Sequence, residues 1–493
     1  MNPDTAEKEI GADDIINDDC SEEYIRLYKP TPLKTITHQS YGPMLSQITS
    51  GMYGMVDSIW ISKFIGEIGL TAVATVFVID YCAIAFGHFI NTAASTRLAY
   101  LFSQKKHKEA NQVVIDLIRT CFIIGVLVPL ILFPLSKPII RWLKASEEVT
   151  NMGFKYLIPR LAFTCTTCIY LTCCGVLQAE GRSWWYGAAQ ICSLLLNMLV
   201  FDPLFLYLFK SVIGASLATI VSELIPCSII LYYLFTKRLT CQPDFSMFFN
   251  PFSQETYAAL KTGLASLVMH VSTTIPNIFL QKFIAIAANN INQYDMVMAI
   301  WNTTVRLYQL SLCIVVALNT AYLPSASFAF GKHNNQRVLD LTLHVSWIST
   351  AWSTFVGILI CFFPKLIARM WSTDSTFLYW AGEILPICFY TIILCSLKFV
   401  FVSYLQACGY PFFAMVLSLT TELLPLPIFA SIMHYTGNKQ SPVRIFIAYI
   451  FNDVFSFIVG CLIVTPKMIK MWKDSKPSLQ RGSSEDSDPI QEL

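Results

Sequence analysis

Long apolar runs separated by short polar segments dominate this sequence. Runs long enough to cross the roughly 30 Å hydrocarbon core of a bilayer occur twelve times. Proline and glycine interrupt several of them, which lipid tolerates only where neighbouring helices or water satisfy the freed backbone groups. The pattern predicts an all-α polytopic membrane protein with twelve transmembrane helices. We expect these spans at 37–61, 70–101, 113–135, 153–177, 184–209, 212–236, 257–288, 294–324, 340–363, 377–405, 411–435 and 443–466.

The sequence also repeats itself, with matches 226 to 228 residues apart. Six spans return a chain to the same side of the membrane, so the two halves are predicted to be parallel repeats: two six-helix bundles facing a central cleft. The matching segments include Leu33-Lys34-Thr35 with Leu260-Lys261-Thr262 and Leu177-Gln178-Ala179 with Leu405-Gln406-Ala407. The predicted organisation is a disordered acidic tail at 1–36, an N-terminal lobe at 37–236, a linker at 237–256, a C-terminal lobe at 257–466 and a disordered tail at 467–493.

Composition agrees with residence in a membrane. Hydrophobic residues make up 55% of the 493-residue chain and charged residues only 13%, whereas an ordinary soluble domain is about 25% charged. Nearly half of the 32 acids lie in the two predicted tails. The net charge of +2 lacks the concentrated basic footprint that nucleic-acid binding needs. We therefore expect the chain to contact a lipid bilayer and no nucleic acid, and to act as a monomer.

Lysine and arginine predict the orientation. With the N-terminus inside, the inner segments hold more of these residues than the outer segments, as in the first inner loop with Lys105, Lys106 and Lys108. Positive charge is retained on the cytoplasmic side of membrane proteins. We therefore expect both termini to be cytoplasmic. A plasma membrane and an organelle membrane both fit the sequence.

Motifs of enzymes and metal proteins are weak in this sequence. Cys165-Thr166-Thr167-Cys168 has a metal-like spacing, but it lies in an apolar run without a second ligand pair. Most of the 16 cysteines are interpreted as small buried hydrophobes. The sequence contains no P-loop, nucleophile elbow or dinucleotide fingerprint. We expect no enzymatic activity, no metal, no bound cofactor and no direct use of ATP.

Two carboxylates inside the predicted spans break the repeat. Asp57 lies near the outer end of its span, and its counterpart in the second half is Ile284. Asp202 lies in span 184–209, and its counterpart is Ala430. A carboxylate inside a membrane is costly and usually has a partner or a function. Because only one half carries these acids, we predict that they serve function rather than folding, with most other acids in loops or near span ends.

The predicted depth in the membrane places these groups at a similar level. At 1.5 Å per helical residue, Asp57 and Asp202 both fall in the outer half of the N-terminal lobe, as do Tyr156 and Thr219. Two carboxylates that close in a low dielectric are not both ionised, so the pair can take up and release a proton. With oxygens from Asn197, Tyr156 and Thr219 it can instead hold Na⁺. The alternative is a local role, with Asp202 as an N-cap before a proline.

Several motifs in one order resemble a known family. They are Gly42-Pro43, Val56-Asp57-Ser58-Ile59-Trp60, Leu177-Gln178-Ala179-Glu180-Gly181-Arg182, Asn197…Asp202-Pro203-Leu204 and Gly214-Ala215-Ser216-Leu217-Ala218-Thr219. Together they resemble the multidrug and toxic compound extrusion (MATE) transporters over most of residues 37–466. The resemblance implies a twelve-helix antiporter in which inward flow of H⁺ or Na⁺ drives export of organic solutes. It implies that the first span bends at Pro43. It also implies a cation site formed by Asp57, Tyr156, Asn197, Asp202 and Thr219, as in DinF-like members.

The chain departs from the family pattern in two places. Asn197 and Asp202 are five residues apart, where the family has four, so Asn197 is expected to point slightly away. Many relatives carry acids in the seventh and tenth spans, where this chain has Thr273 and Leu397-Lys398, so a C-terminal cation site is expected to be absent. Lys398 and Lys282 would either favour an anionic solute, or pair with neighbours or extend their ammonium groups to a membrane interface.

These observations together predict a secondary-active antiporter. It would export small organic compounds such as drugs, toxins or metabolites in exchange for H⁺, or less favourably Na⁺, by alternating access between two lobes. A lipid or lipid-linked sugar flippase of related architecture is the alternative, and it predicts a cationic cleft.

Overall fold

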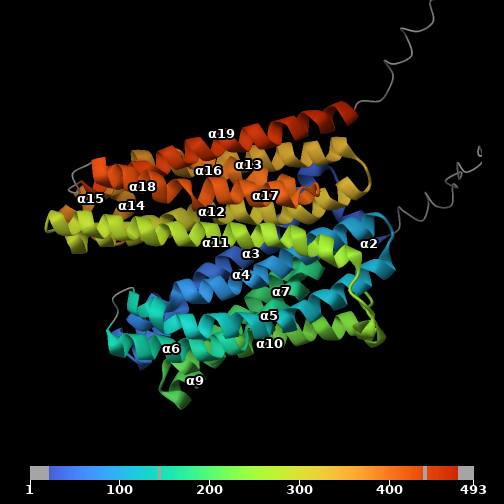
Figure 1. Cartoon of the computed structure of the whole chain (residues 1–493), viewed down its shortest axis with the longest axis horizontal. Coiled ribbons are helices and arrows are strands. Elements are labelled where there is room, and N and C mark those ends of the chain that lie inside the picture. Colours follow the sequence, from blue (N-terminus) through green and yellow to red (C-terminus); the bar gives the residue numbers. More distant parts are fainter. Residues whose placement is uncertain (1–20, 143–145, 437–440, 476–493) are drawn as a thin grey trace, which may run out of the picture.

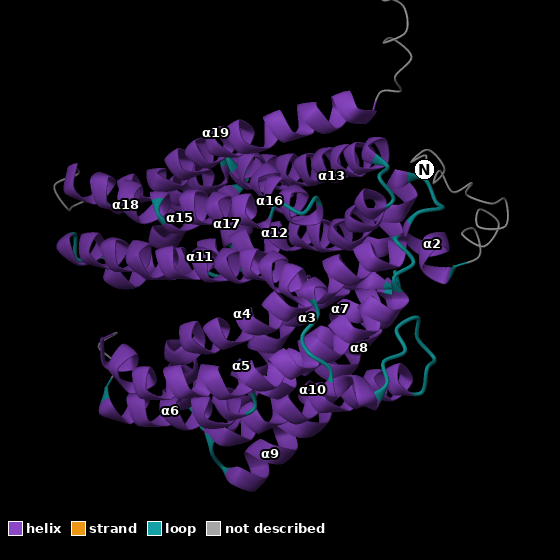
Figure 2. Ribbon diagram, turned by 45° about the vertical axis from the view of Figure 1, so that its right-hand side comes forward, coloured by secondary structure: helices purple, strands orange, loops and turns teal. Residues whose placement is uncertain are grey.

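The computed structural model describes residues 21–142, 146–436 and 441–475. These residues form helices and connecting segments, without strands (Figure 2). The N-terminal lobe contains α3 (Pro32–Phe64), α4 (Glu67–Ser103), α5 (His107–Trp142), α6 (Glu147–Ala162), α7 (Thr164–Ala179), α8 (Ser183–Leu196), α9 (Asp202–Phe209) and α10 (Val212–Phe235). The C-terminal lobe contains α11 (Gln254–Asn290), α12 (Tyr294–Gly331), α13 (Asn335–Phe362), α14 (Pro364–Ala368), α15 (Ser375–Phe389), α16 (Ile392–Ala407), α17 (Pro411–Ser418), α18 (Pro425–Thr436) and α19 (Pro442–Ser475).

The twelve predicted spans are confirmed. Ten helical segments of the described chain are long and apolar enough to cross a membrane, and α6 with α7 forms an eleventh, bent by 52°. The remaining span is α3, a helix of 33 residues that is more polar but packs against α8 and α12 inside the bundle. Several predicted spans contain breaks that the apolar pattern alone did not locate, because a break in an apolar helix leaves its hydrophobicity unchanged.

The backbone repeats as the sequence does. The fourth span breaks at Phe163 between α6 and α7, and the tenth breaks at Tyr390 between α15 and α16. The fifth and eleventh spans each contain a π-helical turn, η1 (Asn197–Phe201) and η3 (Leu419–Leu423). Gly181 and Gly409 end equivalent helices with positive φ angles of 69° and 74°, a conformation that glycine adopts without steric cost. The two halves therefore have helix breaks and helix-ending glycines at equivalent positions.

Both described chain ends lie at the same end of the bundle, which we call the terminus end (Figure 1). The lobes join there through the second half of α4 and the first half of α11. Thr92 donates a hydrogen bond to Ser266 at 3.1 Å, and Arg97 forms an ion pair with Glu255. At the opposite, far end, the Lys282 ammonium lies over the Trp142 ring, 5.2 Å from its centroid.

The short helix α2 (Glu22–Leu27) and the segment after it connect the two lobes at the terminus end. Arg26 donates to the Glu180 carbonyl of the N-terminal lobe at 3.3 Å. Arg337 of the C-terminal lobe donates to the Pro30 carbonyl at 2.9 Å, and Asn334 donates to the Tyr28 hydroxyl at 2.6 Å. The segment therefore links the two lobes at the terminus end.

The structure corrects the predicted tails. Residues 22–27 are helical and α3 begins at Pro32, so the part of 1–36 that the structure describes is ordered. Likewise α19 continues to Ser475, beyond the predicted end of the last span. Residues 1–20 and 476–493 lie outside the described residues. The linker is shorter at its second end than predicted, because α11 already begins at Gln254, and it contains a 3₁₀ turn, η2 (Phe245–Phe249).

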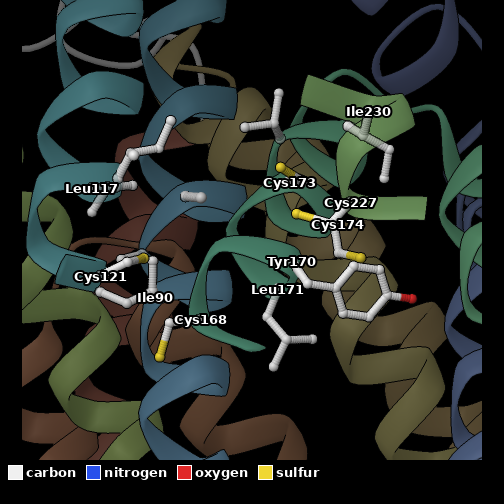
Figure 3. Close-up of a cluster of buried hydrophobic side chains, with 14 of the residues drawn as sticks. Ile90, Leu117, Cys121, Cys168, Tyr170, Leu171, Cys173, Cys174, Cys227 and Ile230 are labelled. Atoms are coloured by element: carbon white, nitrogen blue, oxygen red, sulfur yellow. The ribbon is translucent and has the colours of Figure 1, made fainter. Parts of the chain in front are cut away.

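Several buried cysteines belong to the apolar core of the N-terminal lobe (Figure 3). Cys168, Cys173 and Cys174 lie on α7 beside Ile90 and Leu117. Among the described residues, no group of three or more His, Cys, Asp or Glu side chains is placed to hold a metal ion. These thiols therefore pack as small hydrophobes.

Candidate functional site

Asp57 of α3 and Asp202 of α9 meet inside the N-terminal lobe. Their carboxyl groups lie within hydrogen-bonding reach of each other. Asp202 is fully buried, and Asp57 is half-buried with its Oδ1 shielded from solvent. Asp57 Oδ1 and Asp202 Oδ2 have no hydrogen-bond partner. Two ionised carboxylates cannot donate to each other, so a proton or a cation that joins them would satisfy these oxygens.

Asn197 completes this pair, against the expectation that it points away. Its Nδ2 donates to Asp202 Oδ1 at 3.1 Å, and both side chains are buried. The reason is the π-helical turn η1, in which the Asp202 N–H bonds to the Asn197 carbonyl five residues earlier. The wider turn absorbs one extra residue and returns the two side chains to one face of the helix. The Asn197 Oδ1 is buried and has no partner, so it is a third oxygen open to a cation.

Tyr156 and Thr219 are placed less directly. The buried Tyr156 hydroxyl interacts electrostatically with Asp80 and Arg160 first, and with Asp57 and Asp202 more weakly. Thr219 is buried on α10, which packs against η1. Its Oγ1 donates to the Ala215 carbonyl of its own helix at 3.2 Å, which leaves its lone pairs free to accept. The structure thus brings Asp57, Asp202 and Asn197 together, with the other two predicted residues around them.

Three ionisable residues of this lobe were missed by sequence reasoning. Arg160 and Asp80 form a buried ion pair between Nε and Oδ1 at 2.8 Å. The Glu223 carboxyl accepts a hydrogen bond from Thr167 at 2.7 Å and lies in the field of the same arginine. The prediction that most other acids lie in loops or near span ends therefore has two exceptions in this lobe, Asp80 and Glu223. Each of these residues interrupts an apolar run, a signal that an exact comparison of repeat positions overlooks.

Charge is unbalanced in this cluster. The acids are Asp57, Asp80, Asp202 and Glu223, and Arg160 is the cation that faces them. Because the arginine is engaged with Asp80, the Asp57–Asp202 pair lacks a positive neighbour of its own. An uncompensated charge costs several kcal/mol in a low dielectric. The pair is therefore suited to bind a proton or a small cation reversibly.

Pro43 lies inside α3, which continues through it. A proline removes the hydrogen bond to the carbonyl four residues earlier, here Gln39. The Ser183 hydroxyl of α8 donates to that carbonyl at 2.6 Å and accepts from the Gly42 N–H at 3.0 Å. A Cβ on Gly42 would lie only 2.0 Å from the Ser183 carbonyl oxygen. The expected bend point is thus held against α8 by one serine.

The C-terminal lobe carries acids of its own inside its spans, which corrects the expectation that this half has lost them. Glu422 lies in the eleventh span and Asp453 in the twelfth, at positions shifted from the repeat mates of the N-terminal acids. Lys398 pairs with Glu422 at 2.9 Å. Of the two readings open for this lysine, the structure therefore supports pairing with a neighbour, and Lys282 likewise contacts Trp142.

Comparisons with known proteins agree with this architecture. A family model described as MatE matches residues 43–203 and 279–429. The multidrug export protein MepA of Staphylococcus haemolyticus (strain JCSC1435) is 22% identical over 401 residues, covering 80% of this chain and 86% of that protein.

Two solved transporters share the fold. One is an outward-facing conformation of a multidrug resistance MATE family transporter, with a TM-score of 0.81, 22% identity, and coverage of 91% of this chain and 98% of that chain. The other is a MOP superfamily transporter from Pyrococcus furiosus, described as having a binding pocket of reverse polarity that suggests a different function. Its TM-score is 0.82 with 21% identity and the same coverage, 91% and 98%. At these identities the likeness shows the fold alone.

Proposed function

Since the chain belongs to the MatE family, we propose that it is a secondary-active antiporter exporting small organic compounds in exchange for H⁺, with Na⁺ as the alternative coupling ion. The class of solute follows the relative MepA, which is described as a multidrug export protein. We further propose that both termini are cytoplasmic, which makes the terminus end the inner end of the bundle.

The observation that carries this proposal is the Asp57–Asp202 pair with its unpartnered oxygens. Two carboxyl oxygens and the Asn197 Oδ1 lie buried together without donors. A proton bridging the two carboxyls removes their repulsion, and a Na⁺ ion would take the same oxygens as ligands. Either ion changes how α3 and α9 hold together, so ion binding is linked to the packing of the lobe.

The proposed cycle uses the arrangement of the lobes. Thr92–Ser266 and Arg97–Glu255 join the lobes at the terminus end, and Lys282 contacts Trp142 at the far end. We assign this arrangement to a stage that is closed inside, in which the outer contact must part for solute to leave. A proton then enters at Asp57 and Asp202, the first and fifth spans repack, and the solute leaves. The lobes rock to open the inner end, where the proton is released and a new solute binds.

The flippase alternative is less well supported. It predicts a cationic interior that attracts phosphate groups, whereas the described N-terminal lobe holds four acids, two buried and two half-buried, around one arginine. Negative charge of this kind suits cations and neutral compounds.

Transport by purified protein in vesicles tests the proposal. An organic-cation dye is loaded, and either a pH gradient or a Na⁺ gradient is imposed with the membrane potential clamped. We expect the pH gradient to drive efflux faster than the Na⁺ gradient. Efflux that responds to neither gradient, with the protein folded, would reject the antiporter.

A further inference from the structure

A second buried charge cluster lies in the C-terminal lobe, outside the site described above. Lys398 of α16 is 3% exposed, and its Nζ lies 2.9 Å from Glu422 Oε1 in η3. Asp453 of α19 is 1% exposed, and its Oδ2 accepts a hydrogen bond from Thr391 Oγ1 at 2.7 Å. Three helical spans thus bring two acids and one lysine together at the break between α15 and α16.

The cluster lacks one positive charge. Lys398 is bonded to Glu422 and acts on Asp453 only through space. The remaining titratable groups that face Asp453 are neutral at pH 7 by their ordinary chemistry: Tyr308 on α12, Cys388 on α15, Cys395 on α16 and Tyr449 on α19. One lysine cannot balance two ionised acids, and a buried charge without a partner is costly.

Asn452 gives an independent sign of a missing ligand. This side chain is 4% exposed, and it lies next to Asp453 on α19 and interacts with its carboxyl. Its Oδ1 is buried without a partner. A buried carbonyl oxygen needs a donor or a cation, so an unfilled acceptor lies beside an uncompensated carboxylate.

We propose that Asp453 and Asn452 form a second cation site, filled by one proton or one Na⁺ ion, while Lys398 remains the fixed counter-ion of Glu422. The N-terminal lobe is built in the same way. There Arg160, also on a bent span, neutralises Asp80, and the exchangeable ion belongs to other carboxyls. Each lobe then combines one permanent ion pair with one exchangeable site.

A role in coupling rests on the proposed antiport, whereas ion binding at Asp453 does not. If both sites exchange ions in each cycle, one ion per lobe enters for each solute that leaves. Replacing Asp453 would then lower the number of ions moved per solute by one.

Infrared difference spectroscopy of the purified, full-length protein tests ion binding without transport. All measurements use protein that carries D57N/D202N, because asparagine does not titrate and the N-terminal pair then gives no carboxyl signal. Spectra are recorded across pH in Na⁺ and in an organic cation too large to enter. If Asp453 holds a proton, a protonated carboxyl C=O band is present at neutral pH, vanishes in D453N and persists in E422Q. If it holds Na⁺, replacing Na⁺ shifts a carboxylate band, and D453N abolishes the shift.

Two further results decide the proposal. An Asp453 carboxylate band that stays constant across pH and Na⁺ concentration would overturn it, because the residue would be permanently ionised without a ligand. If D453N does not fold, N452A replaces it. N452A removes the unpartnered amide oxygen that the proposed ion would contact, so we expect it to shift the ion-binding midpoint about tenfold or more. An unshifted midpoint in folded N452A would equally reject the site.

Discussion

Asn197 and Asp202 lie five residues apart in the chain, yet their side chains meet at 3.1 Å on one face of the fifth span. The π-helical turn η1 makes this possible by accommodating one extra residue. Turns of this kind are rare and occur often at functional sites. The relationship makes Asn197 the donor that fixes the carboxyl pair.

Replacing Asn197 by Ala should weaken ion coupling without unfolding the protein. The variant removes a hydrogen bond to a buried carboxylate, worth about 1.5–3 kcal/mol. We expect the midpoint of the pH or Na⁺ dependence of efflux to shift about tenfold or more, with the maximal rate less affected. S228A serves as the control, because the exposed Ser228 hydroxyl donates to the Leu224 carbonyl of its own helix, α10. Equal midpoints in N197A and the wild type would remove Asn197 from the site.

Breaking the Arg160–Asp80 pair should destabilise the protein more than removing both partners. R160M leaves a buried carboxylate uncompensated, at a cost of about 3–5 kcal/mol. The double variant D80N/R160M removes both charges of the pair and should recover part of this loss, although Glu223 also loses its neighbouring arginine. Thermal unfolding in detergent, arranged as a double-mutant cycle, measures the coupling between the two residues. Additive effects would contradict a direct pair.

A disulfide across the inner contact should stop transport reversibly. Thr92 and Ser266 are joined by a hydrogen bond of 3.1 Å between α4 and α11, so cysteines at both positions lie close enough to be bridged. We expect oxidised T92C/S266C to be inactive and a reductant to restore its activity. T92C and S266C alone control for the native thiols. Full activity of the bridged protein would contradict rocking of the lobes at this contact.

Ser183 should control the bend point at Pro43. Its hydroxyl satisfies the Gln39 carbonyl that proline leaves free. In S183A that buried carbonyl loses its donor, which costs about 1–3 kcal/mol, so the straight form of α3 should become less stable. We expect an altered transport rate and faster hydrogen exchange around residues 39–43. A threonine at position 183 retains the hydroxyl and should behave as the wild type. Unchanged exchange in S183A would show that the contact does not hold the helix.

The apolar runs and the internal repeat were sufficient to predict the twelve spans and the two lobes, because both are properties of the linear pattern. Asp57 and Asp202 could be found because their counterparts, Ile284 and Ala430, are apolar. The same comparison concealed Glu422, which lies in the span equivalent to that of Asp202 but at a shifted position. It also concealed Asp453, which lies in the twelfth span. Several sequence positions can place a charge at the same depth in the membrane and on the same face of a lobe. A comparison of single repeat positions therefore misses such shifted acids.

The π-helical turn could not be predicted from the sequence. The segment Asn197–Phe201 is apolar on nearly every side, so hydrophobic periodicity does not distinguish four from five residues per hydrogen-bonded turn. The ion pairs of Arg160 and Lys398 were also beyond reach, since a pair between distant spans depends on how the helices pack. Their position inside apolar runs was the available signal.

The central claim is that ion binding at Asp57 and Asp202 drives export, and gradient-driven efflux compared with passive exchange tests it most directly. Wild-type protein and the D57N, D202N and D57N/D202N variants are reconstituted into vesicles with an organic-cation dye. We predict that each variant loses efflux driven by the ion gradient but keeps exchange of labelled for unlabelled dye without a gradient. Gradient-driven efflux at the wild-type rate in folded D57N/D202N protein would contradict the account.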